Sequence, residues 1–446
     1  MDDKISQLPD ELLLKVLLCL PTKVAVSTSI LSKRWEFLWM WLPKLEYSYS
    51  SESKSWRLSP FIHLNLPLHK APIIESLRLN FDVFDRGIVN GINNWVLIAV
   101  SRCVQELRVT LAFTHYKLAN LAEVPSYLFT CKSLVILELT GKVYVHVPRT
   151  VFLPSLKFLI LRRMWYSDKK SLHKLLSHCP VLEDLLVERN DDDNNRTFTL
   201  SVIVPSLQRL TLKISRGNHF EGLVINTPSL KYFKIMDYIE EYKLEDSSYS
   251  YYFEDTPKLE EADIESTYPD INKFVRSIRS VRRLSLCIRV NADEEALYHE
   301  GIVFGQLQHL KLCSCGPNWS NLLARLLKDS PLLRDLEVYL NDDHTYSRVD
   351  APVPWQNQLD CVPTCLLASL ETFKWTLVYG SQEEIDLVKY ILRNARCLKA
   401  ATILFRPSFC QQEEEKLEMA KQDLICIYVD IYLYAYCQIF FSNLDK

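Results

Sequence analysis

LEDLLV, residues 182–187, is the hexapeptide on which the fold of this 446-residue chain depends. Apolar residues stand at its first, fourth and sixth positions, and in a strand the fourth and sixth side chains point to the same side. One such strand cannot bury its apolar side chains alone, whereas copies stacked side by side bury them together. The hexapeptide therefore predicts a repeating structure.

The same pattern, L-x-x-L-x-L or a close variant, recurs at intervals of 22 to 30 residues. The other copies are IESLRL from Ile74, VQELRV from Val104, LVILEL from Leu134, LKFLIL from Leu156, LQRLTL from Leu207, LKYFKI from Leu230, LEEADI from Leu259, VRRLSL from Val281, LQHLKL from Leu307 and LRDLEV from Leu333. A recurrence of about 20 to 30 residues built on this core is the signature of leucine-rich repeats. It predicts a solenoid of parallel strands.

Helical patterns lie between some of the hexapeptides, at residues 171–179, 271–278 and 321–330. The alternation of helix and strand predicts an α/β fold, a horseshoe with a parallel sheet inside and helices outside. Cys131 and Cys179 both stand three residues before a hexapeptide, where Ser330 also stands. We expect a small buried residue there rather than a reactive thiol.

Residues 4–45 read KISQLPDELLLKVLLCLPTKVAVSTSILSKRWEFLWMWLPKL. Pro9 followed by two acidic residues is typical of a helix start, and the segments after Thr22 and Ser32 predict two more short helices. Three short helices in about forty residues do not close a core of their own. Their apolar side chains need either the rest of the chain or a protein partner, and composition alone leaves both open.

The order and spacing of these residues resemble the plant-type F-box, with Lys4 and Cys19 as departures from its pattern. The matching residues are Ile5-Ser6, Leu8 to Leu13, Leu20 to Lys23, Ala25-Val26, Thr28-Ser29, Leu31 to Trp35 and Leu38-Trp39. The resemblance implies docking on the Skp-type adaptor of a Skp–cullin–F-box ubiquitin ligase, and through it on a cullin. The residues expected to bind the adaptor are Leu8, Pro9, Leu12, Leu13, Val16, Leu17, Leu20 and Trp35.

Residues 341–358 are polar and predict a loop, beyond which the sequence resembles the FBD module that ends many plant F-box/leucine-rich-repeat proteins. The matching residues are Val362 to Leu366, Leu370-Glu371, Trp375, Tyr379-Gly380, Glu383-Glu384 and Tyr390 to Ala395. LETFKW and LKAATI keep the strand pattern, and residues 383–395 and 413–423 predict helices.

The tail, LICIYVDIYLYAYCQIFF at residues 424–441, departs from the FBD pattern. Asp430 near its centre disfavours a membrane span. We expect either a strand on the last repeat or a divergent end from altered splicing.

The predicted organisation is an F-box at residues 1–46, a Ser-rich linker at 47–60, leucine-rich repeats at 61–345 and an FBD-like module with its tail at 346–446. Charge is balanced, with 52 Lys and Arg against 55 Asp and Glu, which disfavours nucleic acid as the main partner. Thirteen cysteines without regular pairing and no recognisable secretory signal predict a reduced protein of the cytoplasm or nucleus.

Sequence patterns of catalysis are absent. Nine glycines form neither a phosphate loop nor a G-x-S-x-G motif, and Cys313-Ser314-Cys315, like Cys361 with Cys365, lacks the second half of a zinc site. Together with this absence, the resemblance to F-box proteins implies a non-catalytic ligase subunit without cofactor or metal, whose repeats bind the target protein. The alternative is a repeat-protein interaction scaffold outside an active ligase.

The hexapeptide also predicts the target-binding surface, because side chains flanking its last two apolar positions face the concave side of the sheet. Across the middle repeats these are Asp184, Leu186, Glu188, Arg209, Thr211, Lys213, Tyr232, Lys234, Met236, Glu261, Asp263, Glu265, Arg283, Ser285, His309 and Lys311. Both charges occur beside Tyr and Met, which suits a protein or peptide better than a uniformly charged nucleic acid. We expect charge to set the register of binding.

Overall fold

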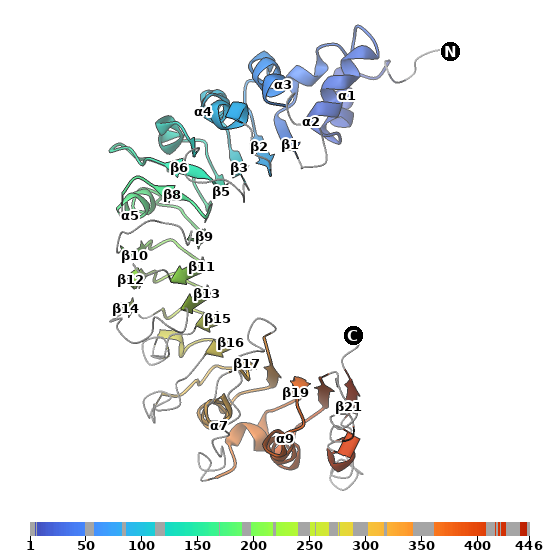
Figure 1. Cartoon of the computed structure of the whole chain (residues 1–446), viewed down its shortest axis with the longest axis vertical. Helices are drawn as coiled ribbons and strands as arrows, with labels where there is room; N and C mark the ends of the chain where they lie inside the picture. Colours follow the sequence, from blue (N-terminus) through green and yellow to red (C-terminus); the bar gives the residue numbers. More distant parts are fainter. Residues whose placement is uncertain are drawn as a thin grey trace. The chain divides into compact units, whose positions relative to one another are not determined.

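The computed structural model describes residues 5, 7–49, 58–82, 86–111, 121–168, 170–189, 198–216, 220–239, 250–254, 256–266, 275, 277–288, 302–315, 319–341, 361–406, 415, 418–419, 421–424 and 438–443. The chain forms two compact units, one of residues 1–227 with 248–250 and one of residues 228–247 with 251–446. Each unit contains a parallel sheet with helices on one side of it (Figure 1).

The sheet of the first unit is built from the repeats. Its neighbouring strands are, in order, β1 (Lys44–Tyr49), β2 (Ser76–Phe81), β3 (Glu106–Leu111), β5 (Ile136–Gly141), β7 (Phe158–Arg162), β9 (Asp184–Glu188) and β11 (Arg209–Arg216). From β2 onward each strand begins two residues after the first apolar residue of a predicted hexapeptide. The predicted parallel arrangement is therefore confirmed here.

Helices and short strands carry the chain from one repeat to the next in this unit. The helical segments are α3 (Leu58–Asn65), η4 (Leu66–Leu68), α4 (Arg86–Ser101), η5 (Ser126–Thr130) and α5 (Ser171–Leu176). The extra strands are β4 (Ala122–Glu123), β6 (Val143–Val145), β8 (Trp165–Tyr166), β10 (Phe198–Ile203) and β12 (Phe220–Asn226), with β14 (Ser250–Phe253) at the sequence boundary between the units. The predicted helix at 171–179 is confirmed by α5.

The N-terminal segment contains α1 (Asp10–Leu18), α2 (Thr22–Ser27), η1 (Thr28–Ile30) and η2 (Leu38–Trp41). The third of the expected helices is thus a single 3-10 turn. At the end of this turn, the carbonyl of Met40 accepts hydrogen bonds from the backbone N–H groups of Lys70 at 2.6 Å and Ala71 at 3.2 Å. These hydrogen bonds join the segment to the first repeats.

At the start of the sheet, the structure differs from the linker expected at residues 47–60. Residues 47–49 belong to β1, and α3 begins at Leu58, while 50–57 lie outside the described residues. LPKLEY, from Leu42, is a further copy of the hexapeptide with Tyr47 in its last position. Leu42, Leu45 and Tyr47 are buried, so the N-terminal segment leads directly into the first strand of the solenoid.

The second unit continues the same pattern in its own sheet. Its neighbouring strands are, in order, β13 (Tyr232–Ile239), β15 (Glu261–Ser266), β16 (Arg283–Ile288), β17 (His309–Cys313), β18 (Asp335–Tyr339), β19 (Thr372–Val378), β20 (Ala400–Phe405) and β21 (Gln438–Asn443). Its helices include α7 (Trp319–Asp329), α8 (Thr364–Ala368) and α9 (Gln382–Asn394). The helices predicted at 321–330 and 383–395 are confirmed by α7 and α9.

The remaining expectations for this unit concern its loops and its end. Only Val275, Ser277 and Ile278 of the helix expected at 271–278 are described, and the loop at 341–358 lies outside the described residues apart from Asn341. The described residues of 413–423 are helical. In the tail, β21 pairs with β20, which confirms the expected strand there, while 425–437 lie outside the description. Within the described portion, no helix is long and apolar enough to cross a membrane.

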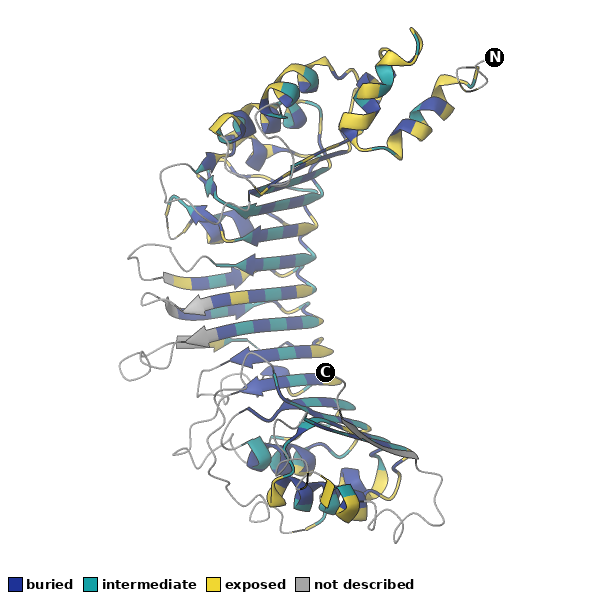
Figure 2. Cartoon of the chain, turned by 45° about the vertical axis from the view of Figure 1, so that its right-hand side comes forward, coloured by how far each residue is buried: buried dark blue, intermediate teal, exposed yellow. Residues whose placement is uncertain are grey.

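The core follows the hexapeptides. The first apolar residue of each copy from Ile74 to Leu370 is at most 1% exposed, and burial alternates along the strands (Figure 2). A fully buried side chain of this size stabilises the fold by about 1.5–3 kcal/mol. Cys131 and Cys179 are buried as expected, and the Cys179 thiol donates to the Leu175 carbonyl at 3.2 Å.

Candidate interaction surfaces

The N-terminal segment exposes an unusual concentration of apolar side chains. Among the described residues, nine of the 23 exposed large apolar side chains lie between Ile5 and Trp41. Leu12 and Val16 stand one turn apart on α1 and are 42% and 45% exposed. The others are Ile5, Leu18, Val24, Ile30, Leu31, Phe37 and Trp41. We call these nine residues the N-terminal apolar surface.

Buried residues hold this surface in place. α1 packs against η2, and Leu13, Leu17 and Trp35 are at most 4% exposed. The Arg34 guanidinium forms an ion pair with the Asp10 carboxylate at 2.8 Å, which ties the start of α1 to the chain after η1. The predicted adaptor-binding residues therefore form three groups. Pro9, Leu12 and Val16 are exposed, Leu8 and Leu20 are half-buried, and Leu13, Leu17 and Trp35 are buried.

An aromatic contact joins the N-terminal segment to the first repeats. The Trp39 and His69 rings meet edge to face with centroids 5.2 Å apart, and His69 is 2% exposed. Burial lowers the pKa of His69 to about 4; the Met40 carbonyl opposes this in part, and the Arg102 guanidinium adds to it. This imidazole is therefore neutral in the folded protein near neutral pH.

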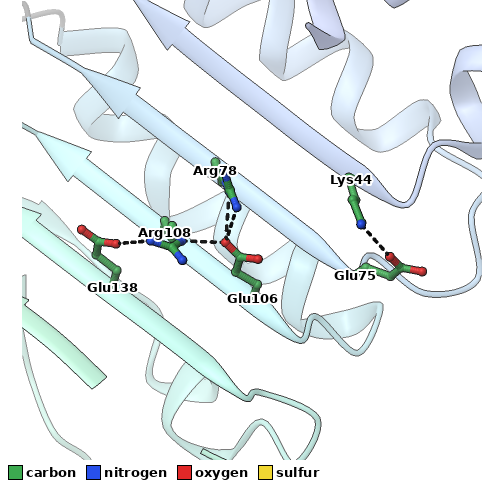
Figure 3. Close-up of polar contacts among 6 residues, drawn as sticks. All are labelled: Lys44, Glu75, Arg78, Glu106, Arg108 and Glu138. Carbon is green, nitrogen blue, oxygen red and sulfur yellow. Dashed lines mark hydrogen bonds and ion pairs between the residues drawn. The ribbon is translucent and has the colours of Figure 1, made fainter. Parts of the chain in front are cut away.

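The side of each sheet opposite its helices, which we call the open face, carries the polar residues of the hexapeptides. In the first unit an ion-pair ladder crosses it (Figure 3). The Glu106 carboxylate contacts Arg78 at 2.9 Å and Arg108 at 2.6 Å, and Arg108 also contacts Glu138 at 2.8 Å. Arg162 extends the ladder to Glu138 at 3.7 Å, so β2, β3, β5 and β7 are linked.

The ladder changes the acidity of its central carboxyl group. Burial alone would raise the pKa of Glu106, but the hydrogen bonds and positive charges of Arg108 and Arg78 outweigh burial and lower it. Glu106 is consequently ionised with both arginines engaged. This ladder is not among the residues predicted from the sequence, although its residues occupy the same hexapeptide positions as those selected in later repeats.

In the second unit the open face is hollowed. A depression of about 440 Å³ crosses the strands from β15 to β19. Its polar lining consists of Glu261, Asp263, Arg283, Ser285, His309, Lys311, Asp335, Glu337, Thr372 and Lys374. The structure therefore brings together six residues of the predicted set: Glu261, Asp263, Arg283, Ser285, His309 and Lys311. Asp335, Glu337, Thr372 and Lys374 were missed, although the hexapeptide rule applied to LRDLEV and LETFKW selects them.

Charges alternate across this depression. The Asp335 carboxylate lies 2.6 Å from His309 Nδ1 and accepts a hydrogen bond from the Thr372 hydroxyl. The Glu337 carboxylate lies 3.8 Å from Lys311 and 3.3 Å from Lys374. Outside the depression, Lys234 contacts Asp263 at 2.6 Å, and burial of the lysine is outweighed by this carboxylate, which raises the pKa of Lys234.

The other predicted residues have different surroundings. In the first unit, Asp184 and Glu188 are half-buried on β9, and Arg209 and Lys213 are exposed on β11, with Arg209 3.5 Å from Asp184. In the second unit, Tyr232 and Met236 are half-buried, and Glu265 is buried, where it accepts a hydrogen bond from the Asn341 amide at 2.6 Å. Leu186 and Thr211 are half-buried as well.

The module after residue 361 completes the second sheet. Trp375 of β19 is fully buried and meets Trp319 of α7 edge to face at 5.3 Å. α9 begins with a capping box, in which the Ser381 hydroxyl accepts from the Glu384 N–H and the Glu384 carboxylate accepts from the Ser381 N–H. The residues that resemble an FBD module thus form a strand, a capped helix and part of the core.

Comparison with known proteins covers all three regions. Family models match the F-box domain over residues 5–47, the LRR repeats of an FBD-associated F-box protein over 92–261, and the FBD over 357–403. The chain is 62% identical over 391 residues to the putative F-box/LRR-repeat protein At4g15060 of Arabidopsis thaliana, covering 87% of this chain and 91% of that protein. The chain belongs to the plant F-box/FBD/leucine-rich-repeat family.

A second relative supports the same membership. The putative F-box/FBD/LRR-repeat protein At4g00315 of Arabidopsis thaliana is 53% identical over 431 residues, covering 93% of this chain and 96% of that protein. The F-box match ends within β1, and the FBD match runs from before α8 into β20. F-box and leucine-rich-repeat domains support the substrate-adaptor role that F-box proteins have in general.

Proposed function

We propose that this family member is the substrate-recognition adaptor of a Skp–cullin–F-box ubiquitin ligase. Its F-box docks on a Skp-type adaptor, and its open face holds the protein to be ubiquitinated. The chain raises the effective concentration of that protein beside the ubiquitin-conjugating enzyme and supplies no bond-making group. The observation that supports this most is the N-terminal apolar surface, which falls within the residues matched by the F-box model.

Within this proposal the predicted adaptor-binding residues divide by burial. Pro9, Leu12 and Val16 are exposed and contact the adaptor directly, with Leu8 and Leu20 at the edge. Leu13, Leu17 and Trp35 are buried and act by holding α1 against η2. Central apolar contacts that lose water on docking contribute most of the binding energy at such interfaces.

The target surface in this proposal is the open face, and above all the depression on the second unit. Its alternating carboxylates and cations suit a protein segment that carries both charges, and a mismatched register would bring like charges together. On the open face of the first unit, Lys213 is exposed. On the second unit, Lys234 is engaged with Asp263. Lys213 is therefore the better residue for a charge reversal.

The test is affinity purification of the full chain from plant cells, with the Skp-type adaptor and captured proteins measured separately. The double variant Leu12→Glu/Val16→Glu should lose the adaptor by about 100-fold or more, since two interface side chains together supply about 3 kcal/mol. Leu97→Glu is the matched control, because Leu97 lies on α4 of the repeats and is 39% exposed. Full adaptor binding by the double variant contradicts the proposal.

A second pair of variants in the same experiment tests the target surface. Lys213→Glu and Arg283→Glu should reduce captured proteins and their turnover while adaptor binding stays at the wild-type level. If neither variant changes capture or turnover, the recognition surface lies elsewhere. Captured proteins that are not ubiquitinated would instead favour an interaction scaffold outside an active ligase.

The proposed compartment is the cytosol or nucleus, where such ligases meet their targets. Asn195-Arg196-Thr197 and Asn318-Trp319-Ser320 match the N-glycosylation sequon, and both should then be unmodified. A mass shift of the native protein after glycosidase treatment would contradict this compartment.

A further inference from the structure

Three cysteines meet at the ends of two neighbouring strands of the second unit. Cys287 lies near the end of β16, Cys313 is the last residue of β17, and Cys315 follows two residues later. Their sulfur atoms all lie within 4.8 Å of one another, and those of Cys287 and Cys315 are 3.7 Å apart. Among the described residues, this is the one group of three metal-ligand side chains this close together.

The cluster is shielded from water. Each of the three cysteines is at most 2% exposed, and Leu340 completes the buried group. Tyr339, Leu377 and Tyr379 pack against it. Leu377 has a φ of +62° at a bulge in β19, a backbone conformation that is uncommon for a residue other than glycine.

The spacing of the sulfur atoms matches metal coordination. A zinc–sulfur bond of about 2.3 Å places the sulfurs of a tetrahedral site about 3.8 Å apart, and a trigonal arrangement places them about 4 Å apart. The distance of 3.7 Å between the sulfur atoms of Cys287 and Cys315 is already close to the tetrahedral value. The distances from these two sulfur atoms to that of Cys313 are 4.8 Å or less, so they need to shorten by at most about 1 Å.

One backbone group is placed to stabilise a bound thiolate. The backbone N–H of Asn341 points to the Cys313 sulfur at 3.4 Å, a contact of the kind that supports metal-bound thiolates.

We propose that Cys287, Cys313 and Cys315 form a binding site for one thiophilic d¹⁰ metal ion, Zn²⁺ or Cu⁺. Soft thiolate ligands select these ions over Mg²⁺ or Ca²⁺. A bound ion joins β16 to the end of β17 beneath the residues of β18 and β19 that pack against the cysteines. It therefore stabilises the part of the sheet beside the depression. This inference is independent of the ligase role proposed above.

The experiment loads the reduced full-length protein anaerobically with Zn²⁺ in one arm and Cu⁺ in the other. After gel filtration, the retained metal is counted by mass spectrometry, and affinity is measured against a competing chelator. We expect one ion per chain in at least one arm, and a loss of affinity of about 100-fold or more for Cys313→Ser. The matched control is Cys365→Ser, because Cys365 is fully buried outside the cluster and its thiol donates to the Leu327 carbonyl.

A spectroscopic readout needs no variant. Co²⁺ bound to the wild-type chain should show the sulfur-to-metal charge-transfer absorption of three thiolate ligands. Wild-type protein that retains no more of either ion than Cys313→Ser, with no such absorption, overturns the proposal.

Discussion

Protonation of His69 should weaken the junction between the F-box and the first repeats. The imidazole is 2% exposed and packs edge to face on Trp39, whose burial also supports η2. Because burial lowers the pKa of His69 to about 4, the folded protein keeps the ring neutral at pH values where the unfolded chain is protonated. Acid therefore favours the unfolded chain at this position.

The size of the effect follows from the two pKa values. An unfolded histidine titrates near 6.5 and the folded one near 4, so the contribution is present above pH 6.5 and is lost as the pH falls toward 4. Between these values the unfolded state binds more protons, and each unit of pH costs up to about 1.4 kcal/mol. From about pH 7.5 to about pH 5 the free energy of unfolding should fall by about 2 kcal/mol through His69 alone.

The assay is urea unfolding of the wild-type protein and of His69→Phe at a series of pH values, followed by tryptophan fluorescence. Phe keeps the edge-to-face contact with Trp39 but does not titrate. The pH dependence of stability that comes from the carboxyl groups is the same in both proteins and therefore cancels in their difference. The stability of wild type relative to His69→Phe should fall by about 2 kcal/mol over that pH range. His178→Gln, at an exposed histidine, is the control and should keep the wild-type slope.

Parallel pH profiles for wild type and His69→Phe would refute this reasoning. They would mean that the buried site admits the charged imidazole at little cost. A steeper loss in the variant would refute it as well, since Phe has no proton to bind.

Two further predictions concern other parts of the structure. Glu106→Gln should lower the free energy of unfolding by about 1–2 kcal/mol at neutral pH, because Arg78 and Arg108 both lose a charged partner that is only partly screened. The difference from wild type should shrink as acid neutralises Glu106, whose pKa is lowered in the folded protein. Urea unfolding at several pH values measures this difference. Glu384→Ala should lower the free energy of unfolding by about 2 kcal/mol, because the N–H groups of Tyr379 and Ser381 lose their acceptor at the start of α9. Glu383→Ala, at an exposed residue of the same helix, is the control and should have little effect in thermal unfolding.

The repeating fold could be predicted from the sequence because the apolar positions of each hexapeptide show which side of its strand is buried. Leu182, Leu185 and Val187 specify which side of β9 is buried whatever its neighbours are, and the same holds for each copy to Leu398. The first copy is harder to recognise, because its last position is occupied by an aromatic residue instead of an aliphatic one. LPKLEY ends in Tyr47 and precedes a Ser-rich stretch, so the sequence predicts a linker from residue 47, where the last three residues of β1 lie. The F-box and FBD regions were recognisable from the order of their residues.

The tertiary structure decided what depends on neighbouring repeats. Periodicity in α1 does not distinguish Leu13 and Leu17, which pack inside, from Leu12 and Val16, which are exposed; contact with η2 makes that difference. Likewise, the ladder through Glu106 and the cluster of Cys287 with Cys313 and Cys315 join side chains of neighbouring strands that stand 24 to 30 positions apart in the sequence. A local pattern states which face a side chain occupies. The register between strands, set after loops of variable length, determines which side chains meet across that face.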